Sequence, residues 1–469
     1  MTQIKFGTDG WRAIIAKEYT VDNVARVSIG TAKWLKANFE NPSVVIGHDC
    51  RFGGEMFAET AAKVFTNNGI KVLLAKGFVS TPMVSLGVVK SAASLGVVIT
   101  ASHNPPAYNG YKLKGSYGGP LLPKHVSEVE SMIPETNELL IERIDLDAMK
   151  EQGLIEEIDL ETMYCDHVAE NFDLDAIKNS DMEFAYDAMY GAGQNVLRRL
   201  LPDTTFLHCD DNPGFEGVAP EPIHRNLQEF SEMIKISENI DCGLATDGDA
   251  DRIGLYNSKG EFVDSHHIIL LLINYMVKHK GMSGKVVTAF SCSNRIKNLC
   301  DQLGLDQETV KIGFKYVCGV MLEEDCLLGG EESGGIAIKG HIPERDGIWM
   351  GLTIWEFMAK TGKSLEDLID EVYGLIGEFK FERIDLHLTD EQKNSIMENC
   401  KNGEYSSFGE YSIERTEDID GYKYFFNGDS QWLMIRPSGT EPVLRTYCEA
   451  ETSEKAFEIL KTAHEALLN

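Results

Sequence analysis

The sequence predicts an α/β protein with three successive layered α/β domains and a smaller α+β domain at its C-terminal end. Short apolar strand patterns alternate with helical patterns up to about residue 376, which is typical of sheets covered by helices. Residues 380–469 differ, because several strand patterns there precede one long helical pattern. The 469 residues also fit roughly three or four domains at ~100–200 residues each.

The first domain, residues 1–150, is predicted from strands and helices in alternation. Val44–Ile46 and Val72–Leu74 are short β-rich runs, whereas Val21–Leu35 and Glu55–Phe65 carry apolar residues at helical spacing. Residues around 134–165 are acidic and lack strand patterns, so we expect a helical connector there.

The second domain, residues 151–256, opens with a strand at Phe184–Asp187 and a turn at Gly191–Gly193. A helix to Leu201 follows, and two strands close the domain. These strands are predicted at Cys242–Ala245 and Ile253–Tyr256.

The third and fourth domains are predicted at residues 257–376 and 377–469. The third has strand patterns at Val286–Phe290 and Leu327–Leu328, and helical patterns near 264–279, 294–303, 347–361 and 364–373. The fourth has strand patterns at Phe379–Leu388, Trp432–Ile435 and Val443–Cys448, and a helical pattern at Glu454–Leu468.

The composition restricts the class of partner. Lys and Arg number 44 against 74 Asp and Glu, so the formal net charge is −30 and argues against nucleic acid or an anionic membrane as partner. The most apolar window, Ile268–Ile273, is too short to span a bilayer. Ten cysteines occur without a C-x-x-C pair, and the start MTQIKFGTDGWR does not resemble a signal peptide. We therefore expect reduced thiols and a cytoplasmic location.

The stretch T-A-S-H-N-P-P-A-Y-N-G-Y-K, residues 100–112, follows a predicted buried strand at Leu95–Ile99. Two prolines and the pair Asn109–Gly110 are turn signals, so the stretch is expected to be a stiff loop that presents Ser102. A backbone-capping role for Ser102 is the ordinary alternative, and Lys112 would then be a solvated surface lysine. No G-x-S-x-G motif is present, which disfavours an α/β-hydrolase nucleophile.

A second polar loop reads T-D-G-D-A-D-R, residues 246–252, between two apolar strands. Three neighbouring carboxylates repel one another unless a cation lies among them, and hard divalent cations prefer oxygen ligands. The EF-hand pattern does not fit, because Asn257 and Ser258 stand near the place of its last carboxylate. An acidic surface turn is the alternative.

Two further loops are weaker signals when each is taken alone. G-G-E-E-S-G-G, residues 329–335, combines glycines with acids that can accept hydrogen bonds from sugar hydroxyls, but a flexible acidic loop fits as well. R-P-S-G-T-E-P, residues 436–442, followed by Arg445, can form a phosphate nest or an ordinary hairpin turn. Together, the four loops suggest phosphoryl transfer with a serine oxygen, a divalent ion, a phosphate site and a lysine whose pKa would have to be lowered to take up a proton.

With these loops the sequence resembles the α-D-phosphohexomutase superfamily, the phosphoglucomutases and phosphomannomutases. The resemblance covers almost the whole chain and follows one order of motifs: F-G-T-D-G-W-R at Phe6–Arg12, T-A-S-H-N-P-P-x-x-N-G-x-K, D-G-D-A-D-R, G-E-E-S-G-G and R-P-S-G-T-E-P. It implies four domains around a central cleft, and interconversion of hexose 1-phosphate and hexose 6-phosphate through a hexose 1,6-bisphosphate intermediate.

The resemblance also implies roles for individual residues. Ser102 would carry a phosphoryl group, with Lys112 as general acid/base and His103 beside the phosphoserine. Mg²⁺ would be bound by Asp247, Asp249, Asp251 and a phosphoserine oxygen. The sugar would be contacted by Glu331 and Ser333, and the non-reacting phosphate by Arg436, Ser438, Gly439, Thr440 and Arg445. Further candidates come from matching stretches: Arg252 for catalysis, Arg12, Lys315 and Arg345 for binding, and Arg51 without an assigned role.

The sugar is expected to be glucose phosphate, because E-E-S is similar to phosphoglucomutase loops, with glucose 1,6-bisphosphate as the intermediate. Mannose or glucosamine phosphate is the alternative within the family. Many of those loops carry a histidine two residues after the serine, where this chain has Gly335, which argues against a histidine role at that place, although His341 could approach from nearby. A metal-dependent serine phosphatase and a non-catalytic sugar-phosphate sensor are the alternatives from other classes. The sequence does not indicate an oligomeric state.

Overall fold

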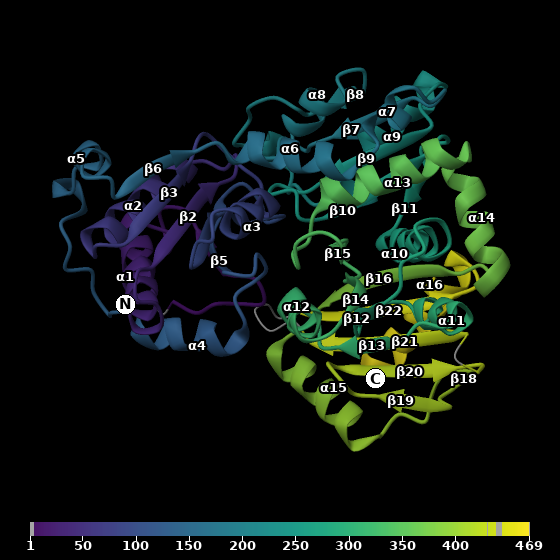
Figure 1. The fold of residues 1–469 in the computed structure, drawn as a ribbon. Coiled ribbons are helices and arrows are strands. Elements are labelled where there is room, and N and C mark those ends of the chain that lie inside the picture. Colours follow the sequence, from purple (N-terminus) through teal and green to yellow (C-terminus); the bar gives the residue numbers. More distant parts are fainter. Residues whose placement is uncertain (1–3, 429, 438–442, 469) are drawn as a thin grey trace. The chain divides into compact units, whose positions relative to one another are not determined.

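The computed structural model describes residues 4–428, 430–437 and 443–468 (Figure 1). The chain divides into two compact units. The first consists of Met1–Val287 with Gly313–Ile369, and the second of Thr288–Ile312 with Asp370–Asn469. Among the described residues, no helix is both long and apolar enough to cross a membrane.

The first sheet is mixed, with strand order β1-β5-β4-β2-β3-β6. Its strands β2, β3, β4 and β6 are parallel, whereas β1 and β5 run antiparallel to their neighbours. The elements in chain order are β1 (Trp11–Ile14), α1 (Val21–Asn38), β2 (Ser43–His48), α2 (Gly54–Asn67), β3 (Lys71–Ala75), α3 (Thr81–Lys90), β4 (Leu95–Ile99), β5 (Tyr108–Gly115), α4 (Pro123–Met132), η1 (Ile141–Arg143), α5 (Leu146–Glu151) and β6 (Ile155–Ile158).

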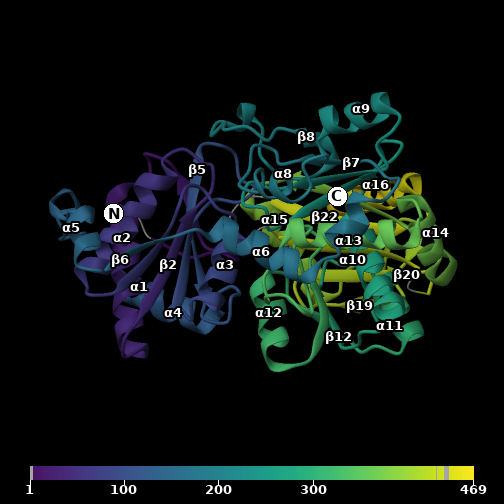
Figure 2. The same cartoon turned by 45° about the horizontal axis from the view of Figure 1, so that its top comes forward.

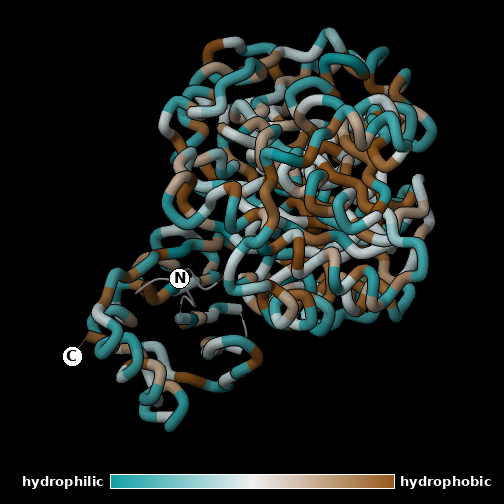
Figure 3. The backbone as a smooth tube through the Cα atoms, turned by 90° about the vertical axis from the view of Figure 1, so that its left-hand side faces the viewer, coloured by the Kyte–Doolittle hydropathy of each residue, from teal (hydrophilic) through white to brown (hydrophobic). Residues whose placement is uncertain are grey.

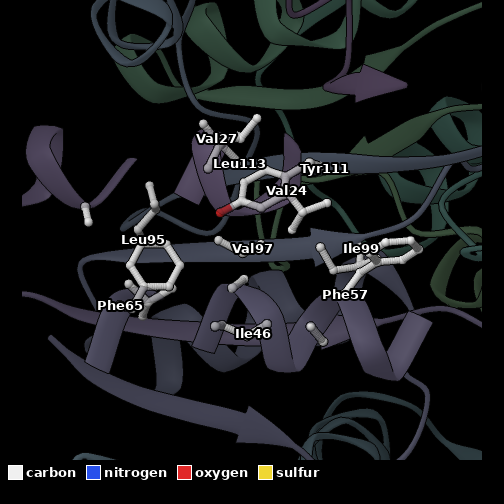
Figure 4. Close-up of a cluster of buried hydrophobic side chains, with 14 of the residues drawn as sticks. Val24, Val27, Ile46, Phe57, Phe65, Leu95, Val97, Ile99, Tyr111 and Leu113 are labelled. Atoms are coloured by element: carbon white, nitrogen blue, oxygen red, sulfur yellow. The ribbon is translucent and has the colours of Figure 1, made fainter. Parts of the chain in front are cut away.

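Helices cover both faces of this sheet. α1 and α2 bury Val24, Val27, Phe57 and Phe65 against alternate residues of β2, β4 and β5, as the close-up in Figure 4 shows. α3 covers the opposite face (Figure 2), where Gly96 of β4 lies directly beneath valines of that helix. Burial of this much apolar surface is the main force that holds the sheet and its loops in place.

The strand β6 corrects one sequence expectation. We expected residues 134–165 to form a helical connector without strands, but Ile155–Ile158 pairs in parallel with β3 and extends the first sheet. The segment reads Ile-Glu-Glu-Ile and buries little beyond Ile155. It forms an edge strand whose acids face water, and such a strand lacks the apolar pattern that identifies a central strand.

The second sheet, also in the first unit, has the order β11-β10-β9-β7-β8. Strands β7, β8 and β9 are parallel, and β10 and β11 add to one side in antiparallel pairs. Its elements are α6 (Leu160–Asn171), α7 (Leu174–Lys178), β7 (Phe184–Asp187), α8 (Val196–Leu200), β8 (Thr205–Leu207), η2 (Phe215–Gly217), η3 (His224–Asn226), α9 (Gln228–Ser237), β9 (Cys242–Thr246), β10 (Ile253–Asn257) and β11 (Phe262–Val263).

The third stretch of the chain contributes the strand pair β14–β15 and several buried helices. β14 and β15 pair antiparallel within the first unit. The elements are α10 (Ser265–Asn274), η4 (Tyr275–His279), β12 (Lys285–Ala289), α11 (Arg295–Leu303), β13 (Gln307–Val310), α12 (Phe314–Glu323), β14 (Cys326–Gly330), β15 (Ile336–Ile338), α13 (Gly347–Thr361) and α14 (Leu365–Ile376). The brown stretches in Figure 3 mark the hydrophobic segments along the chain, and α10 is buried over its whole length.

The C-terminal region in the second unit is a fully antiparallel sheet with order β16-β22-β21-β20-β19. Its elements are β16 (Lys380–His387), α15 (Asp390–Asn402), β17 (Ser407–Phe408), β18 (Tyr411–Ser412), β19 (Arg415–Glu417), β20 (Tyr422–Phe426), β21 (Gln431–Pro437), β22 (Val443–Ala450) and α16 (Ser453–Leu468). The predicted fold class, layered α/β domains followed by a smaller sheet domain with a C-terminal helix, is therefore confirmed.

Candidate active site

Ser102 lies in the loop that follows β4, at the carboxyl end of a buried parallel strand. Its side chain is fully buried, and its backbone has a φ of 53°, in the left-handed region that side chains rarely adopt. The hydroxyl donates a 2.7 Å hydrogen bond to Oδ2 of Asp247, and the amide N–H donates to Oγ1 of Thr100 at 2.9 Å. The serine oxygen is thus aimed at the aspartate loop.

His103 lies beside this oxygen, with Nδ1 3.4 Å from the Ser102 Oγ. Burial, and then the positive charge of Arg252, lower the pKa of His103 well below its usual value. The imidazole is therefore neutral at neutral pH and can accept or donate a hydrogen bond at the serine without adding charge.

The three aspartates follow β9, another parallel strand, and all three are fully buried. One ligand oxygen from each of Asp247, Asp249 and Asp251 lies within 4.8 Å of the others. Oδ1 of Asp249 and Oδ1 of Asp251 are buried and have no hydrogen-bond partner among the residues that the structure describes. A buried carboxylate oxygen without a partner is costly, whereas a divalent cation would satisfy both.

The loop backbone fixes this arrangement. Oδ1 of Asp247 accepts hydrogen bonds from the N–H groups of Asp251, at 2.9 Å, and Arg252, at 3.1 Å. Burial, and then the neighbouring charges of Asp249 and Asp251, raise the pKa of Asp247 well above its usual value. The charges of Asp249 and Asp251 therefore oppose ionisation of Asp247.

Lys112 occupies a different structural setting from the one the sequence predicts. Residues 108–115 form β5, so the predicted turn at Asn109–Gly110 is wrong. A Cβ at Gly110 would lie 2.4 Å from the carbonyl oxygen of Thr100 and 2.8 Å from that of Trp11. This glycine therefore marks a close approach of three strands instead of a turn.

Lys112 is also buried, with 1% of its side chain exposed, and is not a surface lysine. Its Nζ lies 2.7 Å from Oδ2 of Asp249, 2.9 Å from Oδ2 of Asp251 and 2.8 Å from Oδ2 of Asp9. Burial alone would lower the pKa of Lys112, but Asp249, Asp251 and Asp9 raise it above its ordinary value. Lys112 is therefore protonated in this arrangement.

Asp9 is a residue that sequence reasoning missed. Its carboxylate pairs with Arg345 and Lys112, and it also lies 3.8 Å from Lys114 and 3.9 Å from Arg12. Burial would raise the pKa of Asp9, but Arg345 and the other cations hold it well below its usual value. Its signal in the sequence is the motif F-G-T-D-G-W-R, in which the aspartate stands three residues before Arg12.

The three arginines near Ser102 make different contacts. Arg12, at the start of β1, donates from Nη1 to the side chain of Asn104 at 2.8 Å, and burial lowers its pKa. Arg252 lies 4.0 Å from Glu221, and its buried Nε has no hydrogen-bond partner among the described residues. Arg51 is 3% exposed and donates to the carbonyl oxygen of Ser102 from behind the loop.

Arg345 connects the sugar-loop candidates to the aspartates. It pairs with Asp251 at 2.7 Å, with Asp9, and with Glu331 at 3.8 Å. Burial raises the pKa of Glu331, whose Oε1 accepts the backbone N–H of Gly313 at 3.1 Å. A Cβ at Gly335 would lie 2.4 Å from Cδ of Arg345, so the arginine occupies the space that a side chain there would need.

Among the described residues, the remaining candidates of the first unit form no hydrogen bond or ion pair with the three aspartates that follow β9. Ser333 is half-buried in the loop between β14 and β15. Nζ of Lys315 donates to the carbonyl oxygen of Gly7 at 3.2 Å, and burial lowers its pKa. His341 is buried, stacked 3.8 Å from the ring of Trp349 and 2.9 Å from Asp346, so its contacts are structural.

The phosphate-loop candidates belong to the second unit. Arg436 of β21 and Arg445 of β22 are direct cross-strand partners, although like charges in this position destabilise a sheet. Arg436 lies 3.4 Å from Asp420, and the buried Nε atoms of both arginines have no hydrogen-bond partner within the described part of the chain. An anion between them would relieve both costs. Ser438, Gly439 and Thr440 lie outside the described residues.

Comparisons with known proteins match all four stretches of the chain. Family models described as phosphoglucomutase/phosphomannomutase α/β/α domains I, II and III match residues 3–139, 162–260 and 264–375, and the C-terminal domain model matches residues 393–465.

Whole-chain relatives agree with these matches. A phosphoglucomutase/phosphomannomutase from Thermococcus kodakarensis is 31% identical over 97% of this chain and 96% of the relative. A phosphoglucosamine mutase from Halalkalibacterium halodurans is 29% identical over 96% and 95%. A crystal structure of a protein provisionally named phosphomannomutase, from Thermus thermophilus, is 30% identical, with a TM-score of 0.87 over all of both chains.

Proposed function

Since the chain belongs to the phosphoglucomutase/phosphomannomutase, or α-D-phosphohexomutase, family, we propose that it interconverts glucose 1-phosphate and glucose 6-phosphate through Ser102. The observation that carries the proposal is the 2.7 Å contact of the Ser102 oxygen with Asp247 at the edge of the buried aspartate cluster. A backbone-capping serine would have no need of three buried carboxylates next to it.

The proposed metal ligands are Asp247, Asp249, Asp251 and an oxygen of phosphorylated Ser102. Fully buried carboxylates with two unpartnered oxygens suit Mg²⁺, which prefers oxygen donors. When bound, the ion would neutralise charge on the phosphoryl group and orient it.

In the proposed transfer, the bond from phosphorus to the Ser102 oxygen breaks as a bond from phosphorus to a sugar hydroxyl oxygen forms. The proton of that hydroxyl must leave, and the serine oxygen must gain one. Lys112 is the proposed proton carrier. Its three carboxylate partners keep it protonated, so it first donates its proton to the departing serine oxygen. The neutral amine then accepts the proton of the attacking sugar hydroxyl, which restores the ammonium. The reverse transfer to the other end of the bisphosphate completes the cycle.

The arginines have proposed binding roles. Arg436 and Arg445 would hold the phosphate that does not react, because two opposed guanidinium groups recognise an anion and little else. Arg252, whose buried Nε has no hydrogen-bond partner among the described residues, and Arg12, which bonds Asn104 of the serine loop, would contact the reacting phosphate. Glu331 and Ser333 would accept and donate hydrogen bonds to sugar hydroxyls.

The choice of sugar is the finer part of the proposal. The E-E-S sequence at residues 331–333 favours glucose, whereas similarity to a phosphoglucosamine mutase supports glucosamine phosphate as the second candidate. Mannose phosphate is a third, given the relative named for both glucose and mannose. We expect the hydrogen bonds of Glu331 and its neighbours to the sugar to distinguish the three substrates.

The test compares glucose, mannose and glucosamine 1-phosphates at equal concentration with Mg²⁺ and a trace of the matching 1,6-bisphosphate, following the 6-phosphates formed. Glucose should give the highest kcat/KM, and a higher value for another sugar would contradict that choice. Free phosphate as the main product would indicate a phosphatase, and no turnover of any sugar would indicate a sensor. Ser102→Ala should abolish turnover, and an active Ala variant would exclude the serine mechanism.

A further inference from the structure

The Arg51 side chain is held among backbone carbonyl groups of the loop that carries Ser102. Its Nη2 donates to the carbonyl oxygens of Ser102, at 2.5 Å, and Asn104, at 2.6 Å. Its Nη1 donates to those of Pro105, at 2.9 Å, and Tyr108, at 3.2 Å. A single guanidinium therefore binds four carbonyls within seven residues of the chain.

This use of its donors leaves Arg51 without a free face for substrate. Both terminal nitrogens of the guanidinium are committed to these carbonyls, and Nε forms an ion pair with Oδ2 of Asp49 at 3.2 Å without making a hydrogen bond among the described residues. The side chain is 3% exposed and lies behind the serine loop, with its guanidinium 5.0 Å from the ring of Phe215. The geometry therefore does not support direct contact between Arg51 and substrate.

Asp49 supports the same loop by a second route. Its Oδ1 accepts the backbone N–H of Arg51 at 2.9 Å, and its Oδ2 accepts the hydroxyl of Thr100 at 2.6 Å. Thr100 Oγ1 in turn accepts the N–H of Ser102 at 2.9 Å. The buried carboxylate thus holds both the arginine and the start of the serine loop.

The topology explains why these residues meet. β2 and β4 are adjacent parallel strands, so the loops after their carboxyl ends lie side by side, and the N–H of Asp49 donates to the carbonyl of Ile99 at 3.1 Å. Asp49 and Arg51 come directly after β2, and Thr100 and Ser102 directly after β4. The carboxyl ends of parallel strands are where α/β proteins place their sites.

Ser102 needs such support because of its backbone. A non-glycine residue at φ 53° has a sparsely populated backbone conformation, which persists only where the surroundings enforce it. If the carbonyls of residues 102–108 were released, the loop would relax toward an ordinary conformation, and the serine oxygen would leave its position beside Asp247.

We propose that Arg51 is a positioning residue for phosphoryl transfer. By holding four carbonyls of the 102–108 loop, it keeps the Ser102 oxygen directed at the aspartate cluster without touching substrate. This inference rests on the proposed function. A lysine cannot replace the arginine, because an ammonium offers three donors from one atom and cannot span carbonyls that a planar fork reaches.

The experiment compares Arg51→Lys with wild type and with the control Arg26→Lys. Arg26 is another buried arginine of the same domain, and it also bonds a backbone carbonyl, that of Pro134, at 2.9 Å. Kinetics on glucose 1-phosphate, phosphorylation of Ser102 by glucose 1,6-bisphosphate followed by mass spectrometry, and amide hydrogen exchange of residues 102–108 are measured for all three proteins.

Arg51→Lys should lower kcat by about 100-fold, the loss expected for a misplacement of ~1 Å, while KM stays within about 3-fold. Phosphorylation of Ser102 should slow in proportion, and exchange should accelerate in residues 102–108. Arg26→Lys should change neither exchange in this loop nor kcat. Wild-type kcat in Arg51→Lys, or a loss carried by KM alone, would overturn the proposal.

A second variant covers the case in which Arg51→Lys does not fold. Thr100→Val keeps the size of the side chain but removes both hydrogen bonds of its hydroxyl, and it should lower kcat in the same direction with faster exchange at the loop. Unchanged kcat and unchanged exchange in Thr100→Val would also overturn the proposal. A wild-type protein that turns over no hexose phosphate would instead refute the proposed function, and the exchange comparison would still show whether Arg51 holds the loop.

Discussion

Gly248, the second residue of the D-G-D-A-D-R motif, allows the aspartate loop to approach Ser102. A Cβ built at this position would lie 2.6 Å from the carbonyl oxygen of Ser102 and 3.0 Å from Cγ of Pro220. Real Cβ atoms essentially never approach a neighbour closer than 3.0 Å, and ordinary contacts begin at 3.4 Å. Gly248→Ala must therefore separate the two loops by about 0.4–0.8 Å.

The size of the expected effect follows from this displacement. If ~1 Å of misplacement costs on the order of 100-fold in rate, a shift of this size should lower kcat about 10-fold. The same shift should cost about 1–3 kcal/mol of folding free energy, as overpacking of a close contact does. KM for glucose 1-phosphate should change little, because the substitution moves the reacting serine and no proposed sugar ligand.

The assay is steady-state kinetics with urea unfolding, and Gly319→Ala is the control. Gly319 lies within α12, where an added Cβ would lie 3.9 Å from Cδ2 of Leu122, an ordinary contact distance. This control should keep full kcat and gain up to about 1 kcal/mol from the better helix propensity of alanine. Wild-type kcat and stability in Gly248→Ala would refute the reasoning that the close approach places Ser102.

Three further predictions address the metal, the phosphate and a buried lysine. A chelator should abolish turnover and Mg²⁺ should restore it, and Asp251→Asn should raise the Mg²⁺ concentration needed; activity that survives the chelator would exclude a metal requirement. Arg436→Ala should raise KM for glucose 1-phosphate about 10- to 100-fold, from the loss of a charge-assisted bond of ~1.5–3 kcal/mol, whereas Arg415→Ala on the nearby surface should not. Burial lowers the pKa of Lys423 from 10.5 to about 8. Between these two pKa values, Lys423 is protonated more in the unfolded chain than in the folded protein. The free energy of unfolding of wild type should therefore rise with pH across that window. In urea unfolding at pH 8 and pH 10, the free energy of unfolding of Lys423→Met should lack this rise. An equal rise with pH in wild type and variant would contradict the assignment.

The sequence predicts the strand–loop arrangement well where apolar runs end in polar motifs. The strands before Ser102 and before Asp247 are short runs of apolar and small residues that are fully buried, so their pattern identifies them, and the residues that follow lie at the carboxyl ends of parallel strands. Composition likewise identifies the aspartates, because three alternating carboxylates are unusual in an ordinary turn.

Other features depend on contacts between residues far apart in the chain. Lys112 looks like a loop residue because Asn109–Gly110 is a common turn pair, and only the packing of β5 between β1 and β4 shows why glycine is needed there. Asp9 acquires its meaning from cations supplied by later segments, which no local pattern reveals. The pKa of Lys112 is raised for the same reason.

The ion pairs centred on Asp9 have a consequence for how this protein could change during evolution or in the laboratory. Lys112 and Arg345 each bind both Asp9 and Asp251, so no member of this group can be replaced without altering the charge balance of the others. Substitutions within it should be strongly non-additive, and a second change could partly rescue the first. New sugar preferences would then arise more readily at positions outside this group, such as Ser333, where a change leaves the shared charges intact.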